Sequence, residues 1–215
     1  MQVSERLARS ILAGQLRDGA RLPPERDLAE EMGIAVGTLR RALDLLAEQG
    51  MLERVQGSGN YIRKPAQPSN IYAFFRLETP EGPGLPTAEL LAVDRVAKPA
   101  DLPAFGTSDS AHRIRRIRAL DGLPVAAEEI WLDGSAAQAI TARDLSESLY
   151  YFYRVRLGLT ITAVEDRLGQ ATPPDWARPH LDLPDPAPHV ARLSRAGGDH
   201  PIEYSRTWID PERAV

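Results

Sequence analysis

The sequence predicts an α+β protein of two domains. Apolar residues recur at helical spacing through about the first 50 residues, whereas short strand-like runs separated by turn residues fill the chain after about residue 88. Between these regions, residues 65–71 form a polar stretch with two prolines, which is typical of a linker. We therefore expect one domain over residues 1–64, a linker over residues 65–71 and a second domain over residues 72–215.

Composition restricts the class of protein. The 215 residues are 43% hydrophobic and 26% charged, which suits two small cores and excludes a disordered chain. The chain has no cysteine, hence no disulfide and no thiolate ligand. No apolar run approaches the ~20 residues that cross a bilayer, and no signal-peptide pattern opens the chain. We expect a cytoplasmic protein with no membrane partner, and the scattered histidines predict no metal site or other cofactor.

Charge is divided unevenly between the two domains. Residues 1–64 carry 10 basic and 9 acidic side chains, whereas residues 65–215 carry 16 and 21. The net charge of −4 therefore arises in the second domain. The first domain can still bind a polyanion where its arginines share one face.

The first domain is predicted to begin with three short helices. A helix over residues 3–16 has an apolar stripe of Val3, Leu7, Ile11 and Leu12. Pro24 suits the first turn of a second helix, and Gly33 supplies a left-handed turn after it. A third helix follows at once and ends at Gly50; its buried stripe is Leu39, Leu43 and Leu46, and its solvated side is Arg40, Arg41, Asp44 and Glu48.

A hairpin over residues 51–63 follows the helices. Its turn contains Gly57 and Gly59, which permit positive φ and let backbone N–H groups approach a phosphate. Two short helices joined by a glycine turn and followed by a glycine-rich hairpin are typical of a winged helix-turn-helix, which binds double-stranded DNA.

This region resembles the GntR family of bacterial transcription regulators. The matching residues are Leu22, Pro23, Glu25, Arg26, Leu28, Thr38, Arg40, Ala42, Leu43, Gly57 and Gly59. The resemblance implies that Arg26 and Arg40 contact DNA, that Thr38 lies on the phosphate side and that the wing reaches the minor groove at Gly57. The predicted DNA-contact set is Arg26, Val36, Thr38, Arg40, Arg41, Gly57 and Ser58.

The chain departs from the family pattern at three positions. Pro24 stands where the family has Ser, and Ala35 and Val36 stand where it has Ser or Thr followed by Arg. Each lost hydroxyl costs roughly 1 kcal/mol of capping or phosphate binding. An arginine in place of Val36 would discriminate guanine by about 1–3 kcal/mol. We therefore expect an unusual or less discriminating operator.

The second domain is predicted to be a largely antiparallel sheet with a few helices. Strands are expected over residues 88–96, 112–120, 125–132, 161–168, 190–196 and 201–209. Asp121-Gly122 and Gly197-Gly198-Asp199 are turn signals between strands. Helices are expected over residues 100–105, 146–157 and 174–181.

Two segments of this domain resemble the UTRA domain, the ligand-sensing domain of the HutC-like GntR subfamily. Residues 116–128 combine a strand, a turn with Asp and Pro, and a strand that ends near Glu, and residues 201–204 read Pro-Ile-Glu-Tyr. The resemblance covers about residues 70–215 and implies a chorismate-lyase-like fold. A family tyrosine expected late in the last strand falls near Trp208 and Ile209 here.

The expected sensing site contains six residues. Arg116 and Arg118 are two apart on a strand, so their guanidiniums share a face and suit a phosphate or carboxylate. UTRA members that sense phosphorylated amino sugars have two arginines, two serines and two glutamates at the matching positions. These positions are Arg116, Arg118, Glu128, Ser146, Ser148 and Glu203. Three alternatives remain open: a solvated row of arginines, a helix cap at Ser146, and structural salt bridges from Glu128 and Glu203.

Together these features predict a ligand-responsive transcription regulator, expected to be a repressor. It would bind an inverted-repeat operator as a homodimer, and a small anionic effector, a phosphorylated sugar or an organic acid, would control its affinity. The alternative is an enzyme of chorismate-lyase-like fold that acts on a small carboxylated metabolite. The sequence pairs no nucleophile with an oriented base, so no catalytic residue is predicted.

Overall fold

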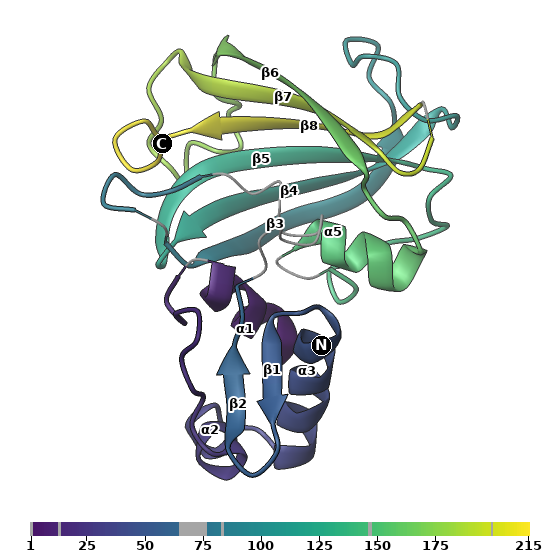
Figure 1. The fold of residues 1–215 in the computed structure, drawn as a ribbon. Helices are drawn as coiled ribbons and strands as arrows, with labels where there is room; N and C mark the ends of the chain where they lie inside the picture. The colour runs from purple at the N-terminus through teal and green to yellow at the C-terminus, as the bar shows by residue number, and fades with distance from the viewer. Residues whose placement is uncertain (1, 13, 65–76, 83, 146–147, 199) are drawn as a thin grey trace. The chain divides into compact units, whose positions relative to one another are not determined.

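A computed structural model describes residues 2–12, 14–64, 77–82, 84–145, 148–198 and 200–215. The chain divides into two compact units, Met1–Phe75 and Arg76–Val215, each of which is described by itself. The linker predicted at residues 65–71 lies outside the described residues. The α+β fold class is as predicted, with short helices and a hairpin in the first unit and a large sheet in the second (Figure 1).

The first unit contains helices α1 (Gln2–Leu12), α2 (Glu25–Glu31) and α3 (Val36–Glu48), followed by strands β1 (Leu52–Val55) and β2 (Gly59–Ile62). The two strands pair antiparallel as the predicted wing. One apolar core joins the helices to the hairpin; it includes Leu7, Ile11, Leu22, Leu28, Leu39, Leu43, Leu46, Met51 and Ile62. The helical periodicity therefore identified the core face correctly.

Two details of this unit differ from the prediction. The first helix ends at Leu12 instead of residue 16, and Gly14 follows with a φ of +75° that breaks the helical conformation. Pro24 lies one residue before the second helix, at its N-cap, instead of in its first turn. The turn at Gly33 has a φ of +65°, as the prediction required.

The second unit is a six-stranded sheet. Its strands are β3 (Pro86–Ala97), β4 (Ser110–Leu120), β5 (Leu123–Asp133), β6 (Ala163–Ala171), β7 (Ala187–Arg195) and β8 (Pro201–Ile209). Their spatial order is β3-β4-β5-β8-β7-β6, and every neighbouring pair is antiparallel. Asp121 and Gly122 both have positive φ, which makes the tight turn between β4 and β5.

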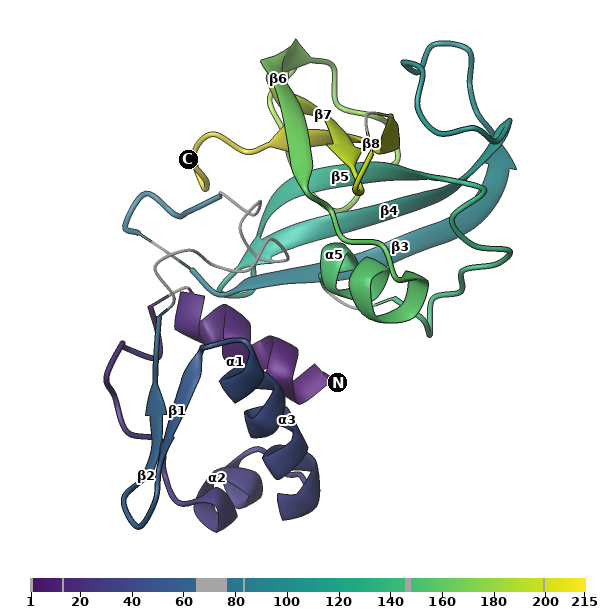
Figure 2. The ribbon, with the colours of Figure 1, turned by 45° about the vertical axis from the view of Figure 1, so that its right-hand side comes forward.

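A short helix covers one face of this sheet. Helix α5 (Leu149–Phe152) continues into a π-helical turn, Tyr153–Leu157. Figure 2 shows α5 against the sheet, and a hydrogen bond of 2.9 Å joins the Tyr150 hydroxyl to Ser194 on β7. The side chain of Ser148 caps α5 by accepting from the backbone N–H of Tyr151. This helix lies within the predicted span of residues 146–157.

The helices predicted over residues 100–105 and 174–181 are wrong, because both segments form turns. In the first segment the Phe105 carbonyl accepts from Lys98, whose ammonium also lies 2.6 Å from the buried carboxylate of Asp133. In the second, Pro179 has no N–H for a helical hydrogen bond. A lysine anchored to the sheet in the first segment and a proline in the second thus account for the absence of these two helices.

Neither helix of the helix-turn-helix has a side-chain cap in the described structure. Ala35 has φ −69° and ψ 140°, the extended conformation from which a hydroxyl reaches the first turn of α3. We expect Ala35→Ser to stabilise α3 by roughly 1 kcal/mol. Hydrogen exchange of the α3 amides in the full chain would measure this. Ala20→Ser, in an exposed loop, is the control and should leave exchange of the α3 amides unchanged. Equal exchange in the two variants would contradict the prediction.

Candidate functional site

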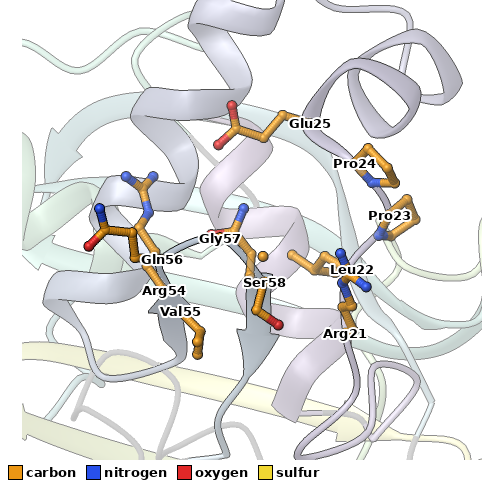
Figure 3. Close-up of a pocket in the computed structure, with 12 residues that line it drawn as sticks. Arg21, Leu22, Pro23, Pro24, Glu25, Arg54, Val55, Gln56, Gly57 and Ser58 are labelled. Carbon is orange, nitrogen blue, oxygen red and sulfur yellow. The ribbon is translucent and has the colours of Figure 1, made fainter.

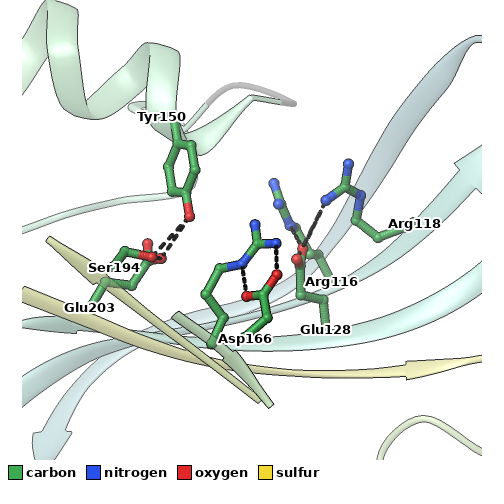
Figure 4. Close-up of polar contacts among 8 residues, drawn as sticks. Arg116, Arg118, Glu128, Tyr150, Asp166, Ser194 and Glu203 are labelled. Atoms are coloured by element: carbon green, nitrogen blue, oxygen red, sulfur yellow. Dashed lines mark hydrogen bonds and ion pairs between the residues drawn. The ribbon is translucent and has the colours of Figure 1, made fainter. Parts of the chain in front are cut away.

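The face of the sheet beneath α5 carries two arginines that share one carboxylate. Arg116 and Glu128 are opposite each other on β4 and β5, and Arg116 Nε donates to Glu128 Oε2 at 2.5 Å. Arg118, two residues further along β4, has Nη1 3.4 Å from Glu128 Oε1. Figure 4 shows the three side chains converging above the sheet. The structure therefore brings together three of the predicted effector residues.

The cluster is buried, which strengthens the interactions among its charges. Arg116 is 7% exposed and Glu128 is 9% exposed. Burial opposes the ionisation of Glu128, but the charges of Arg116 and Arg118 outweigh it and lower the pKa of Glu128 to about 2. Burial also lowers the pKa of Arg118 to about 9, although Glu128 opposes the shift. At pH 7 one carboxylate thus lies between two cationic guanidiniums.

A second polar group surrounds Glu203 on β8. Ser194 on β7 donates to Glu203 Oε1 at 2.8 Å, and the Tyr150 hydroxyl donates to the same oxygen at 3.3 Å. Figure 4 shows Tyr150 pointing from α5 toward this carboxyl. The other oxygen, Oε2, is buried, and the buried hydroxyl of Tyr153 interacts with this carboxyl. Burial raises the pKa of Glu203, which favours its neutral form.

A third arginine, Arg192 on β7, was not predicted. Its Nε and Nη2 form two hydrogen bonds of 2.6 and 2.7 Å to Asp166 on β6. Burial lowers the pKa of Arg192, but the hydrogen bonds to Asp166 and Tyr150 outweigh this and raise it. The charge of Arg192 also acts on Arg118 and on Glu128. The predicted strand over residues 190–196 places Arg192 and Ser194 on one face, because side chains alternate along a strand. This is the sequence signal from which Arg192 could have been predicted.

The other residues of the predicted effector set differ in how their places in the structure compare with their predicted roles. Ser146 lies outside the described residues. Ser148 caps α5, so the capping role considered for Ser146 belongs to Ser148. The salt bridge considered for Glu128 is present, to both arginines. The alternating arginines Arg113 and Arg115 face the other side of the sheet, where they pair with Asp94 and Glu129.

In the first unit, an ion pair joins the two helices of the helix-turn-helix. Arg40 Nε on α3 donates to Glu25 Oε2 on α2 at 2.6 Å, and this hydrogen bond lowers the pKa of Glu25 and raises that of Arg40. The Arg40 side chain remains 65% exposed. Since a guanidinium has five N–H donors, Arg40 can hold Glu25 and still bind a phosphate or base.

A hollow of about 500 Å³ lies between the start of α2 and the wing. Figure 3 shows the wing residues Gln56, Gly57 and Ser58 on one side and Pro23 and Pro24 on the other. The cationic side chains that line it are Arg21 and Arg54. Gly57 and Ser58 of the predicted DNA-contact set therefore share this hollow with two arginines.

The predicted DNA-contact residues differ in exposure. Arg26, Arg40, Arg41 and Gly57 are exposed, whereas Val36, Thr38 and Ser58 are half-buried. Val36 packs against the apolar core, and the Ser58 hydroxyl lies 2.6 Å from the Tyr61 hydroxyl. Val36 and Ser58 therefore have structural partners as well as the predicted DNA contact.

The described residues contain no group of three or more His, Cys, Asp or Glu side chains arranged to hold a metal ion. They also contain no helix long and apolar enough to cross a membrane.

Comparison with known proteins identifies the family. Residues 1–62 match the bacterial regulatory proteins of the gntR family, and residues 84–214 match the UTRA domain. The chain belongs to the GntR family. Its HutC-like form, a GntR helix-turn-helix followed by a UTRA domain, is the one that the sequence motifs predicted.

Individual GntR relatives span most of the chain. The HTH-type transcriptional regulator SmoD of Agrobacterium fabrum is 56% identical over 98% of this chain and 91% of its own length. MngR of Escherichia coli, named as the repressor of a mannosyl-D-glycerate transport/metabolism system, is 26% identical over 98% of this chain and 91% of its own. The crystal structure of PhnF from Mycobacterium smegmatis shares the fold, with a TM-score of 0.53 and 23% identity over 98% of this chain and 95% of that one.

Membership of the GntR family establishes a DNA-binding transcription regulator and excludes the enzyme considered as an alternative. GntR regulators respond to small molecules. The polar cluster under α5 is therefore a candidate ligand site.

The low pKa of Glu128 predicts a pH-dependent stability of the second unit. Because folding lowers this pKa from its usual 4.5 to about 2, the folded form gains stability above pH 4.5 and loses it as pH falls toward 2. Glu128→Gln should therefore cost on the order of 3 kcal/mol at pH 7 and progressively less at lower pH.

Tryptophan fluorescence can follow this unfolding, since all three tryptophans lie in the second unit. Glu89→Gln, which removes an exposed carboxylate from β3, is the matched control. A difference between wild type and Glu128→Gln that stays constant from pH 7 to pH 2 would contradict the assignment.

Proposed function

We propose that this GntR-family regulator binds a small anionic metabolite on the sheet face beneath α5 and that binding changes its affinity for an operator. The observation that carries the proposal is the buried group of Arg116, Arg118 and Arg192 around Glu128. Buried charges are costly to maintain unless a protein pairs them or uses them. Among the described residues, Glu128 pairs with Arg116 and Arg118, and Asp166 pairs with Arg192. Three guanidiniums gathered on one buried face favour a ligand that brings negative charge.

The second polar group suggests what else the ligand carries. Glu203 has a buried oxygen, Oε2, beside the Tyr153 hydroxyl, and a ligand hydroxyl or amine could join this polar group. Tyr150 and Ser194 extend the polar surface between Glu203 and Arg192. A phosphate or carboxylate joined to a hydroxylated body matches both groups. A phosphorylated sugar or a hydroxylated organic acid meets this description.

One relative supports this class of effector. MngR is named as the repressor of a mannosyl-D-glycerate transport/metabolism system, and that compound combines a sugar with a carboxylate. The same combination of one anion and several hydroxyls suits the two polar groups of this chain. The expected effector set is Arg116, Arg118, Glu128, Ser146, Ser148 and Glu203, together with Arg192 and Tyr150.

For the DNA side, we propose that α3 enters the major groove and the wing contacts the adjacent backbone. Arg26, Arg40 and Arg41 are exposed and would supply the charged contacts. One recognition helix covers only a few base pairs, so an inverted repeat bound by a homodimer would provide the specificity. Repression follows if the effector-free form is the one that binds the operator.

Effector binding and DNA binding would then be coupled through a shift between two arrangements of the dimer. A ligand changes DNA affinity only by its differential affinity for the DNA-competent arrangement and the incompetent one. Residues 65–71 are proposed as the connection through which the second domain reorients the first. The effector site and the DNA surface should therefore be separable by mutation.

Arg40→Ala should weaken operator binding by about 1–3 kcal/mol, because it removes a charged contact to DNA and the ion-pair partner of Glu25. A fluorescence-anisotropy titration at several salt concentrations would measure the loss. Arg17→Ala removes the same charge from an exposed residue outside the predicted contact set and serves as control. Wild-type binding by Arg40→Ala at every salt concentration would contradict the placement of α3 on DNA.

Arg118→Ala should abolish the effector response while operator binding without effector remains within ~3-fold of wild type, since the mutated residue lies outside the winged helix. Titration calorimetry against a panel of sugar phosphates and hydroxy acids would identify a wild-type ligand, which is then added to the operator complex. Arg178→Ala, at a side chain that is 54% exposed, is the matched control. Ligand binding that is indifferent to both Arg116→Ala and Arg118→Ala would refute the proposed site.

A further inference from the structure

The segment that precedes α2 runs beside the wing. The backbone N–H of Leu22 donates to the carbonyl of Asn60 on β2 at 2.9 Å, and Arg21 forms an antiparallel bridge with Tyr61 on the same strand. This pairing fixes the backbone of Arg21 against the hairpin. The side chain of Arg21 is exposed.

The guanidinium of Arg21 lies against the wing at Gly59, directly after the turn. A Cβ at Gly59 would lie 3.0 Å from Arg21 Nε and 3.5 Å from Nη2, so the guanidinium occupies space that a side chain would otherwise fill. Gly59 also has a φ of +135°, a conformation that other residues rarely adopt. The glycine therefore lets an arginine from outside the hairpin reach the wing.

Arg21 brings positive charge to a part of the wing whose own residues are uncharged. The turn reads Gln-Gly-Ser-Gly over residues 56–59, and β2 reads Gly-Asn-Tyr-Ile. The two arginines of the hairpin are engaged elsewhere: Arg54 lies 2.8 Å from a carboxylate of α3, and Arg63 pairs with a carboxylate of β1. Among the residues that the structure describes, no carboxylate pairs with Arg21.

This charge lies in the hollow of about 500 Å³ between the wing and the start of α2. Arg21 and Arg54 line the hollow together with two members of the predicted DNA-contact set (Figure 3). The carboxylate of Glu25 also lines it and would repel an anion, but Arg40 Nε already donates to this carboxylate at 2.6 Å. The hollow therefore favours an anion, and Arg21 is the cation available to bind it.

We propose that Arg21 binds a backbone phosphate of the operator in this hollow, as a DNA contact beyond the predicted set. A guanidinium presents parallel N–H donors to two phosphate oxygens, and each phosphate that a protein neutralises releases counterions from the DNA. Such a contact positions the wing on the duplex without reading a base. The inference rests on the proposed contact between the wing and the DNA backbone and names a side chain that makes it.

Replacement of Arg21 tests the contact through the salt dependence of binding. Arg21→Ala should weaken binding ~3- to 10-fold at physiological salt, equally on an operator duplex and on a shuffled duplex of the same composition. The slope of log Kd against log salt concentration should fall by about 0.9 for each bound copy of the chain. Arg21→Lys keeps the positive charge and should retain the wild-type slope.

Fluorescence-anisotropy titrations of the full chain at several salt concentrations would measure both quantities. The operator duplex is one that the wild-type chain selects from a random-sequence library. Arg17→Ala removes an exposed arginine outside the hollow and should leave the slope unchanged.

A wild-type slope in Arg21→Ala would overturn the inference. A fall of equal size in Arg17→Ala would also overturn it by indicating a general effect of charge, and an equal fall in Arg21→Lys would do so by indicating a change in the shape of the wing. A loss on the operator that exceeds the loss on the shuffled duplex by more than ~3-fold would assign Arg21 to a base instead of a phosphate. Weaker binding by Arg40→Ala together with a wild-type slope in Arg21→Ala would overturn this inference alone and leave the proposed placement of α3 intact.

Discussion

The carboxylate of Glu128, held between two arginines on a buried sheet face, is the interaction on which the second unit depends. A buried guanidinium is tolerated only when an opposite charge or a ligand compensates it. Among the described residues, Glu128 pairs with both Arg116 and Arg118, and their charges lower its pKa to about 2. The same arrangement therefore contributes to stability and underlies the proposed anion site.

The helix-turn-helix uses charge in a different way. There the Glu25–Arg40 pair is exposed, so it contributes little to folding. Its effect is to restrict the direction of one guanidinium on α3 while other N–H donors of that group remain able to bind. The uncapped start of α3 and the half-buried Val36 leave this helix with fewer base-reading groups than the family pattern supplies. Backbone phosphates and DNA shape would then carry more of the recognition.

Sequence periodicity was sufficient to predict the fold class and all six strands of the large sheet, because alternation and tight turns are local signals. It also predicted that Arg116 and Arg118 share a face, since that follows from strand geometry alone. Arg192 was missed because its position beside this pair depends on which strands are neighbours, and β7 reaches the cluster only through the order β5-β8-β7. The helix predicted over residues 100–105 failed for a related reason: a distant carboxylate, Asp133, anchors the lysine that holds this loop.

The salt bridge between Lys98 and Asp133 has a practical consequence for labelling. The chain contains two lysines, and the side chain of Lys98 is 16% exposed and bound to a buried carboxylate. The other, Lys64, is exposed and lies at the end of the wing hairpin, directly before the segment proposed to connect the domains. An amine-reactive dye should therefore modify Lys64 in preference to Lys98. A fluorophore at that position would report on the junction between DNA-binding and sensing domains without any engineered cysteine.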